Sequence, residues 1–102
     1  MFRIIETTTD DIQIAESICQ SIIKRKLSPC VQIIEPVKST YIWEDKIESI
    51  SEYTVKIKSI ERHINEISSI IIDISNYDVP EIISYKFKIE NVEYGDWFVD
   101  SI

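Results

Sequence analysis

Two neighbouring stretches decide the fold: Pro36-Val-Lys-Ser-Thr-Tyr-Ile-Trp43 and Ile50-Ser-Glu-Tyr-Thr-Val-Lys-Ile-Lys58. Apolar and polar side chains alternate along both with a period of two, which is typical of strands with one buried face. The connection from Glu44 to Ser49 is short and charged, so the strands are predicted to form an antiparallel hairpin. Arms of about eight residues would reach roughly 25 Å, which is long for a small domain. We therefore expect part of the hairpin to pair outside its own subunit.

The sequence before the hairpin predicts a strand, a helix and a second strand. Phe2–Thr8 is β-prone, and Ile12–Leu27 repeats its apolar residues at spacings of three and four, as an amphipathic helix does. Ser28-Pro29 is expected to end this helix. Cys30–Ile34 is the next strand, and Pro36 lacks an amide hydrogen, so an edge position, a bulge or a bend is expected there.

The sequence after the hairpin predicts a second helix, a further strand and a docked tail. Ile60–Ile74 carries an isoleucine stripe at helical spacing, Ser75–Asp78 is a turn by composition, and Val79–Lys88 is β-prone. The aromatic tail Asn91–Ile102 is expected to dock as a short helix or strand. The order β, α, β, β, α, β predicts a single α+β domain over residues 1–102, with a ferredoxin-like antiparallel sheet and two helices on one face.

Composition limits the classes of partner. The net charge of −7 argues against nucleic acid, which is bound through clustered Lys and Arg. The longest apolar run, Ile70–Ile72, is too short for a membrane span, and Met1–Glu6 does not resemble a secretory signal, so a cytoplasmic protein is expected. Cys19 and Cys30 lack the CxxC spacing and are predicted to be buried thiols.

Three segments carry a family resemblance. Residues 27–34 read Leu-Ser-Pro-Cys-Val-Gln-Ile-Ile, residues 39–48 read Ser-Thr-Tyr-Ile-Trp-Glu-Asp-Lys-Ile-Glu, and residues 77–83 read Tyr-Asp-Val-Pro-Glu-Ile-Ile. They resemble the segments Leu-Ala-Ala-Cys-Val-Asn-Ile, Ser-x-Tyr-x-Trp-x-Gly-x-Ile-Glu and Tyr-x-Val-Pro-Glu-Ile of the CutA divalent-cation tolerance proteins. With the Ile57-Lys58 pair and the late Trp97, the resemblance runs from about Thr7 to Phe98.

The resemblance implies a tightly packed homotrimer whose long hairpins cross to neighbouring subunits. It also implies a cytoplasmic protein that is linked to copper and other divalent cations and shaped like the trimeric PII-type signalling proteins. Members proposed to bind copper carry a Cys and a His pair at positions that are Thr7, Ile74 and Ser75 here, so that copper site is predicted to be absent. Asp45 replaces the Gly of the family's hairpin, which is expected to change the turn but not the fold.

The candidate binding residues are an aromatic and charged set that is predicted to line a cleft between subunits. The set consists of Cys30, Tyr41, Trp43, Lys58, Tyr77, Glu81 and Trp97. The rings would stack on a small anionic ligand and Lys58 would supply positive charge, although trimer packing uses the same residue types. Cys30 is the candidate metal ligand, since a thiolate binds copper and other soft ions.

The single histidine and the acidic residues of the hairpin are weaker candidates for a functional site. The single histidine, His63, is predicted to lie on the polar, solvent-exposed face of the second helix. Glu44, Asp45, Glu48 and Glu52 would gather hard cations around a trimer or simply form a charged surface.

Motifs for catalysis are missing. The sequence contains no nucleophile elbow, no Ser/His/Asp set and no metal triad, and Thr7–Asp11 lacks the Arg that an acylphosphatase-like phosphate loop needs. The aromatic and basic strand motif of RNA-binding domains is also missing. We therefore expect a binding or regulatory module, not an enzyme, for divalent metal ions such as copper or for a small ligand. The alternative is a structural or protein-interaction trimer that recruits a signalling partner, as PII proteins do.

Overall fold

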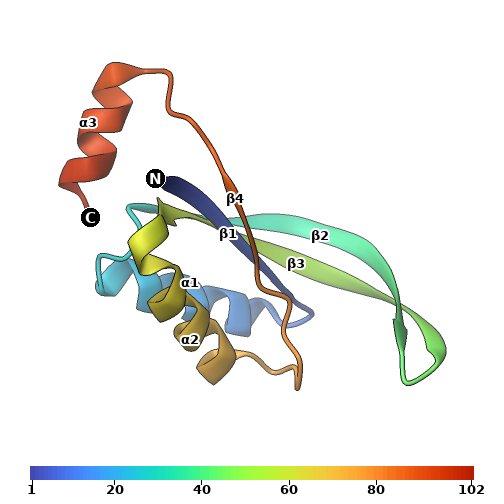
Figure 1. The fold of residues 1–102 in the computed structure, drawn as a ribbon. Helices are drawn as coiled ribbons and strands as arrows, with labels where there is room; N and C mark the ends of the chain where they lie inside the picture. The colour runs from blue at the N-terminus through green and yellow to red at the C-terminus, as the bar shows by residue number, and fades with distance from the viewer.

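The computed structural model describes residues 1–102 and contains a four-stranded antiparallel sheet in the order β2-β3-β1-β4 (Figure 1). The elements in chain order are β1 (Phe2–Thr9), α1 (Ile12–Lys24), β2 (Cys30–Trp43), β3 (Lys46–Ile60), the 3₁₀ helix η1 (Glu61–His63), α2 (Ile64–Ile74), β4 (Ile83–Lys86) and α3 (Val92–Asp100). Helices α1 and α2 cover one face of the sheet, and α3 lies beyond one end of it. The predicted ferredoxin-like α+β fold is confirmed. No helix is both long enough and apolar enough to cross a membrane.

The core lies between the sheet and the paired helices. Most of its members lie on the apolar stripes of the two helices and on the inward face of β3, and the cluster consists of Ile5, Ala15, Ile18, Ile22, Leu27, Val55, Ile57, Ile67, Ile70 and Ile71. Because α1 and α2 both place their apolar stripes on the same sheet face, the opposite face is free to form a separate surface.

The hairpin of β2 and β3 is the longest feature of the molecule. Its paired residues run from Cys30 opposite Lys58 to Trp43 opposite Lys46, with a bulge between Ile34 and Val37. Pro36 lies in this bulge on an edge strand, as its missing amide hydrogen requires. The hairpin projects from the body as a curved ribbon (Figure 1), and it gives the molecule a long dimension of 47 Å against 25 and 22 Å.

The hairpin turn is tighter than predicted. The expected connection from Glu44 to Ser49 is wrong, because β3 begins at Lys46 and only Glu44 and Asp45 connect the strands. Both residues have positive φ, 52° and 64°, the conformation of a two-residue type I′ turn. This backbone matches the twist of the strands, so the turn closes directly after Trp43.

Helix α1 ends three residues earlier than predicted. The helix does not reach Leu27, because Lys26 takes a left-handed φ of 56° and its amide donates to the carbonyl of Ile23. The amide of Leu27 donates to the carbonyl of Ile22, which completes a Schellman motif. Lys26 occupies the position that usually holds glycine.

Two other boundaries differ from the prediction. Helix α2 begins at Ile64 and not at Ile60, because Ile60 is extended and pairs with Phe2 as the last residue of β3. The predicted strand Val79–Lys88 is confirmed only for Ile83–Lys86, the residues that pair with β1. Pro80 lies in the preceding loop, where its missing amide hydrogen removes no bond from the sheet.

The C-terminal tail docks as helix α3. Asn91 caps its start, since the side chain of Asn91 accepts a hydrogen bond from the amide of Tyr94. Phe98 is fully buried, with its ring centroid 5.4 Å from that of Phe2 and 6.1 Å from that of Phe87, both edge-on. These contacts hold α3 against β1 and the chain that follows β4.

Candidate functional site

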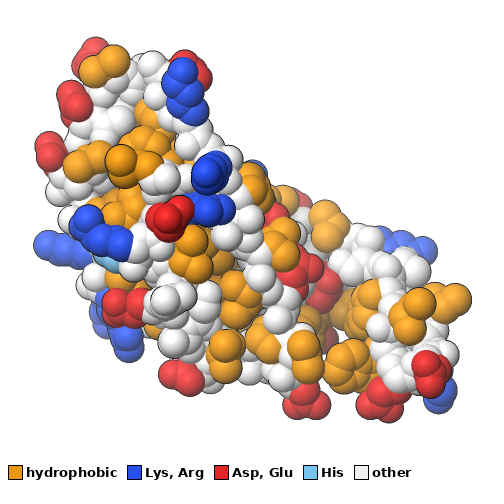
Figure 2. Space-filling model, viewed as in Figure 1, with side chains coloured by type: hydrophobic (Ala, Val, Ile, Leu, Met, Phe, Trp, Pro, Cys, Tyr) orange, Lys and Arg blue, Asp and Glu red, His pale blue; other side chains and the backbone are white.

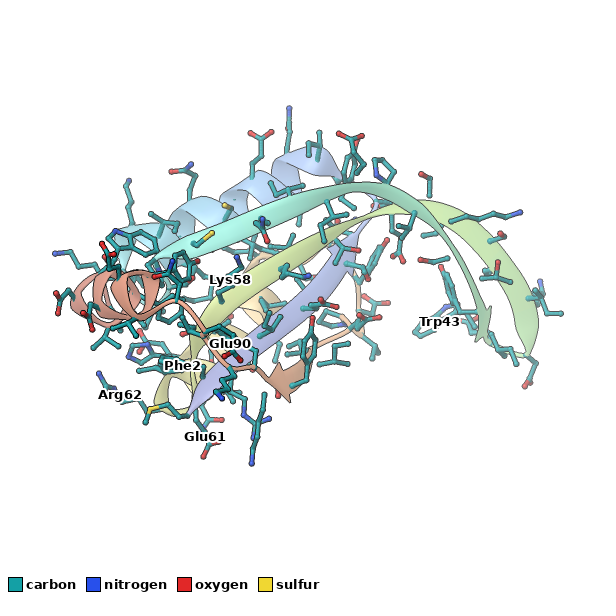
Figure 3. The ribbon with its side chains drawn as sticks, turned by 90° about the horizontal axis from the view of Figure 1, so that it is seen from above. Phe2, Trp43, Lys58, Glu61, Arg62 and Glu90 are labelled. Atoms are coloured by element: carbon teal, nitrogen blue, oxygen red, sulfur yellow. The ribbon has the colours of Figure 1, made fainter.

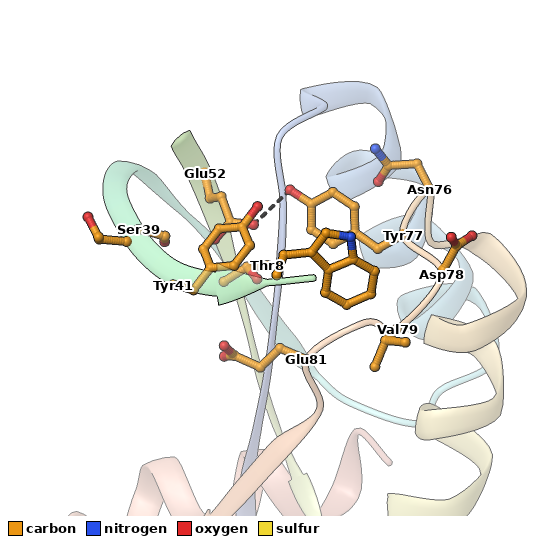
Figure 4. A pocket seen from close by; sticks show the side chains of 11 residues that line it. Thr8, Ser39, Tyr41, Glu52, Asn76, Tyr77, Asp78, Val79 and Glu81 are labelled. Carbon is orange, nitrogen blue, oxygen red and sulfur yellow. Dashed lines mark hydrogen bonds between the residues drawn. The ribbon is translucent and has the colours of Figure 1, made fainter. Parts of the chain in front are cut away.

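A pocket of about 640 Å³ lies between the hairpin and the loop that joins α2 to β4 (Figure 4). We call it the hairpin pocket. Its lining includes three aromatic and three acidic residues: Tyr41, Trp43, Tyr77, Glu52, Asp78 and Glu81. Figure 2 shows apolar side chains gathered at the hairpin end of the molecule, next to the hollow that separates the hairpin from the body.

One hydrogen bond joins the two walls of the hairpin pocket. The phenol of Tyr77 donates to Oε2 of Glu52 at 2.7 Å (Figure 4). Glu52 is only 5% exposed although it lies in a projecting hairpin. Burial, followed by the bond to Glu52, raises the pKa of Tyr77 well above its usual range. Tyr77 therefore stays protonated and remains a donor.

The loop that carries Tyr77 is fixed to the end of β1. Thr9 Oγ1 donates to Asn76 Oδ1 at 2.7 Å, and Asn76 Nδ2 donates to Asp10 Oδ1 at 2.8 Å. The amide of Tyr77 donates to Ser75 Oγ at 3.1 Å. These bonds orient the loop so that Tyr77 faces the hairpin. Asn76 was not among the predicted site residues, because its turn composition does not reveal partners 66 and 67 residues away.

The hairpin pocket is negatively charged within one chain. Glu52, Asp78 and Glu81 line it, and no Lys or Arg does. Burial raises the pKa of Glu81, and the negative charges of Glu52 and Glu6 raise it further. The predicted anionic ligand would therefore need positive charge from another subunit.

The seven predicted site residues of one chain lie in two separate places. Tyr41, Trp43, Tyr77 and Glu81 meet at the hairpin pocket, whereas Lys58 lies 12 residues along β3 from Lys46, the partner of Trp43. That separation is roughly 40 Å at ~3.3 Å per residue. Figure 3 shows Trp43 and Lys58 at well-separated places along the hairpin.

Lys58, Cys30 and Trp97 lie toward the α3 end of the sheet. The ammonium of Lys58 is 6.0 Å from the ring centroid of Tyr94, a cation–π contact, and Cys30 is the residue opposite Lys58 in the ladder. Trp97 is on α3 with its ring centroid 5.4 Å from that of Tyr94. A smaller pocket of about 320 Å³, lined in part by Ile4, Lys58 and Tyr94, lies here.

The three residues at the positions where the resemblance implies copper ligands do not fit copper. Thr7 is buried in β1, and its hydroxyl has no hydrogen-bond partner. Ile74 ends α2 and offers no donor atom, and Ser75 Oγ is taken by the amide of Tyr77. Copper is held by thiolate, thioether or imidazole ligands, none of which these residues supply. No group of three or more His, Cys, Asp or Glu side chains that could hold a metal ion occurs anywhere in the chain.

Two predicted surface features are placed differently. His63 lies in η1 and is half-buried, and its Nδ1 is 3.1 Å from the carbonyl oxygen of Leu27. The solvated role predicted for His63 is therefore wrong: its Nδ1 carries the proton and donates to the turn after α1. Glu52 faces the hairpin pocket, and it forms no metal-binding group with Glu44, Asp45 and Glu48.

The sequence comparisons agree with the fold. Residues 3–101 match the protein family described as "CutA1 divalent ion tolerance protein". The chain is similar to Protein CutA 1, chloroplastic, from Oryza sativa subsp. japonica, with 30% identity over 98 residues, which are 96% of this chain and 55% of the rice protein. It is 31% identical over 97 residues to the divalent-cation tolerance protein CutA of Pyrococcus horikoshii, covering 95% of this chain and 94% of that protein. The chain spans about half the length of the plant and animal relatives that it matches.

A solved structure also has the same architecture. The periplasmic divalent cation tolerance protein CutA from Archaeoglobus fulgidus superposes with a TM-score of 0.92 at 28% sequence identity. The similarity covers 99% of this chain and 98% of the archaeal chain. The long hairpin and α3 therefore both belong to the shared fold.

Proposed function

The chain belongs to the CutA1 divalent ion tolerance family, and on that premise we propose that it is a cytoplasmic homotrimer that binds a small ligand in the hairpin pocket. In this role it is a regulatory module without catalytic activity. The observation that carries the proposal is the hairpin pocket itself, where three aromatic rings and a buried, hydrogen-bonded carboxylate meet around about 640 Å³. Mostly preformed pockets of this size with a few fixed polar groups are typical of small-molecule sites.

Exposed apolar surface on the hairpin supports the homotrimer. Ile42 and Ile47 are 74% and 79% exposed and do not line the hairpin pocket. The outer edge of β2 has no partner strand. Long hairpins with such residues need a covering partner, and a closed ring of identical copies provides one. Three copies is the number that the CutA resemblance implies.

A small ligand is favoured over copper by the donor atoms. The family's link to divalent ions would be indirect in this chain, because Thr7, Ile74 and Ser75 supply neither thiolate nor imidazole. Cys30 is the one predicted metal ligand that remains, and one thiol without companions does not form a site.

A protein-interaction role is the second candidate, and α3 favours it. Val92, Trp97 and Val99 on this helix are 76%, 47% and 57% exposed. Exposed apolar side chains on a helix at one end of the molecule would suit the recruitment of a partner protein.

Two measurements test the proposal. Sedimentation equilibrium at micromolar concentration should give a particle of about 36 kDa, three times the chain mass of 12.0 kDa, and a 12 kDa particle would overturn the trimer. Crystals should show electron density for a bound small molecule at Trp43. Trp43→Ala should lose that ligand while its thermal stability is unchanged, and a large loss of stability would instead assign Trp43 to subunit packing.

Calorimetry tests the metal alternative. We expect Cu(I), Cu(II) and Zn(II) to bind no more tightly than they bind a scrambled acidic control peptide. Saturable binding that disappears in Cys30→Ser would instead establish Cys30 as a metal ligand.

A further inference from the structure

We propose that the hairpin pocket recognises an organic cation, a primary ammonium group held between aromatic rings and carboxylates. This inference rests on the proposed function in one respect, namely that the hairpin pocket is the ligand site. It names the chemical class of the ligand, and it replaces the anionic class that the sequence predicted. Three independent properties of the pocket support it: its charge, its aromatic walls and a free acceptor atom.

The charge of the pocket selects a cation. Glu52, Asp78 and Glu81 line it without any Lys or Arg. Glu6 lies near enough for its charge to act on Glu81. An anion entering this space would lose water and gain only like-charge neighbours, whereas a cation would gain opposite charges at short range.

The aromatic walls select an organic cation over a bare metal ion. Tyr41, Trp43 and Tyr77 present ring surfaces to the same space, and a cation over such a ring is stabilised by the ring quadrupole, most strongly for Trp. A hard metal ion would need six or more oxygen ligands. The pocket does not supply them, because no three carboxylates come together as a metal-binding group.

Glu52 offers an acceptor atom that is fixed in place. The hydrogen bond from Tyr77 occupies Oε2, so Oε1 is left to accept a bond from an N–H group. Since Glu52 is only 5% exposed, this oxygen is held rigidly, and a charge-assisted bond to it would be short and directional. Glu81 is exposed at the same pocket and can approach the cation from another side.

The ammonium group has two possible sources with the same chemistry. One is a free small amine. The other is a lysine of a neighbouring copy of this chain, for which the hairpin offers Lys38 and Lys46, both exposed and neither in an ion pair. The experiment below separates the two sources.

The chain contains two Trp residues, so the NMR signals of their indole N–H groups report on the pocket and on a distant site at once. Butylammonium chloride is titrated into the full chain at constant ionic strength, and sodium butyrate serves as an anion of matched shape. We expect the Trp43 signal to move saturably with butylammonium and not with butyrate, while the Trp97 signal stays constant. Glu81→Gln should weaken butylammonium binding about fivefold, and Glu16→Gln, an exposed carboxylate on α1 outside the pocket, should leave it unchanged.

The remaining outcomes are decisive. If butylammonium moves the Trp43 signal only in Lys38→Gln or Lys46→Gln, the cation is a lysine of a second copy and the proposal stands with that source. If butyrate binds and butylammonium does not, the cation class is wrong while the hairpin pocket remains a ligand site. If neither ion moves the Trp43 signal in the wild type or in the lysine variants, both this inference and the assignment of the ligand site to this pocket are overturned.

Discussion

The phenol of Tyr77 lies 2.7 Å from Oε2 of Glu52 and donates a hydrogen bond to it, which joins the loop after α2 to the hairpin. This is the only side-chain hydrogen bond between that loop and the hairpin. Glu52 is nearly inaccessible to water, so the bond satisfies a carboxylate that solvent cannot reach easily. The shape of the hairpin pocket and the stability of the fold therefore depend on the same pair.

Tyr77→Phe should destabilise the protein by about 1–3 kcal/mol, the usual cost of leaving a buried polar group without its partner. Urea unfolding of the wild type and the variant measures the difference. Glu52→Gln is the matched control, because the amide oxygen still accepts from Tyr77, so this variant should lose less stability than Tyr77→Phe. A Tyr77→Phe variant as stable as the wild type would show that the hydrogen bond contributes nothing.

Glu81→Gln should stabilise the protein at neutral pH and not in acid. Partial burial against the pocket wall raises the pKa of Glu81 above its ordinary value of 4.5, and the charges of Glu52 and Glu6 raise it further. The folded state therefore holds the proton more tightly than the unfolded state, and stability falls as pH rises from about 4.5 through the folded pKa. Since Glu81 is exposed, the gain should be small, roughly 1–3 °C in Tm at pH 7.5. An equal gain at pH 4 would contradict this explanation.

Thr7→Val should stabilise the protein by about 1 kcal/mol, because it removes a buried hydroxyl that has no hydrogen-bond partner and keeps the shape of the side chain. Thr9→Val is the matched control on the same face of β1. Thr9 Oγ1 donates to Asn76 and accepts from the amide of Asp11, so its loss should destabilise. Chemical denaturation of both variants tests the prediction, and a loss of stability in Thr7→Val would mean that its hydroxyl is satisfied.

Much of the fold could be predicted from hydrophobic periodicity. The stripe through Ile18 and Ile22 predicted α1, and the alternation around Val55 and Ile57 predicted β3, because burial of one face imposes the period directly. The exact residues at which helices and strands end were less predictable. Helix α1 stops at a lysine in the left-handed conformation, and nothing in the local sequence distinguishes Lys26 from a residue inside the helix.

The candidate site could be predicted only in part. The segment resemblances identified Tyr41, Trp43, Tyr77 and Glu81, which do meet at one pocket. Asn76 was missed, since its bonds to Thr9 and Asp10 connect distant parts of the chain. Within one chain Lys58 lies apart from these four residues, because the length of β3 separates it from Trp43, so the sequence alone could not show which charges of a single chain face the pocket.

Lys26→Gly should stabilise the protein by about 1 kcal/mol, which corresponds to a rise of roughly 4 °C or more in Tm. The left-handed φ of 56° at Lys26 is unfavourable for a residue with a Cβ and free for glycine. Lys26→Ala is the control, because it removes the charge and keeps the Cβ. A similar Tm increase in both variants would assign the effect to charge and not to backbone conformation.

Asp45→Gly should stabilise the hairpin by a comparable amount, about 1 kcal/mol, because glycine is strongly preferred at the second position of a type I′ turn. Asp45 has a φ of 64° in that position. The measurement is amide hydrogen exchange of Trp43 and Lys46, the pair that closes the turn, and exchange should slow in the variant. Asp45→Ala, which keeps the Cβ, should not slow it.

Pro36 and the bulge around it determine what kind of assembly the free edge of β2 permits. An unbroken edge strand of this length would be a template for endless strand addition, the route to fibres. The bulge between Ile34 and Val37 interrupts the ladder, and Pro36 presents no amide hydrogen there. Any strand that adds to this edge is therefore limited to short stretches on either side of the bulge. The same interruption that shapes the hairpin therefore limits edge-to-edge polymerisation of a chain that is rich in isoleucine.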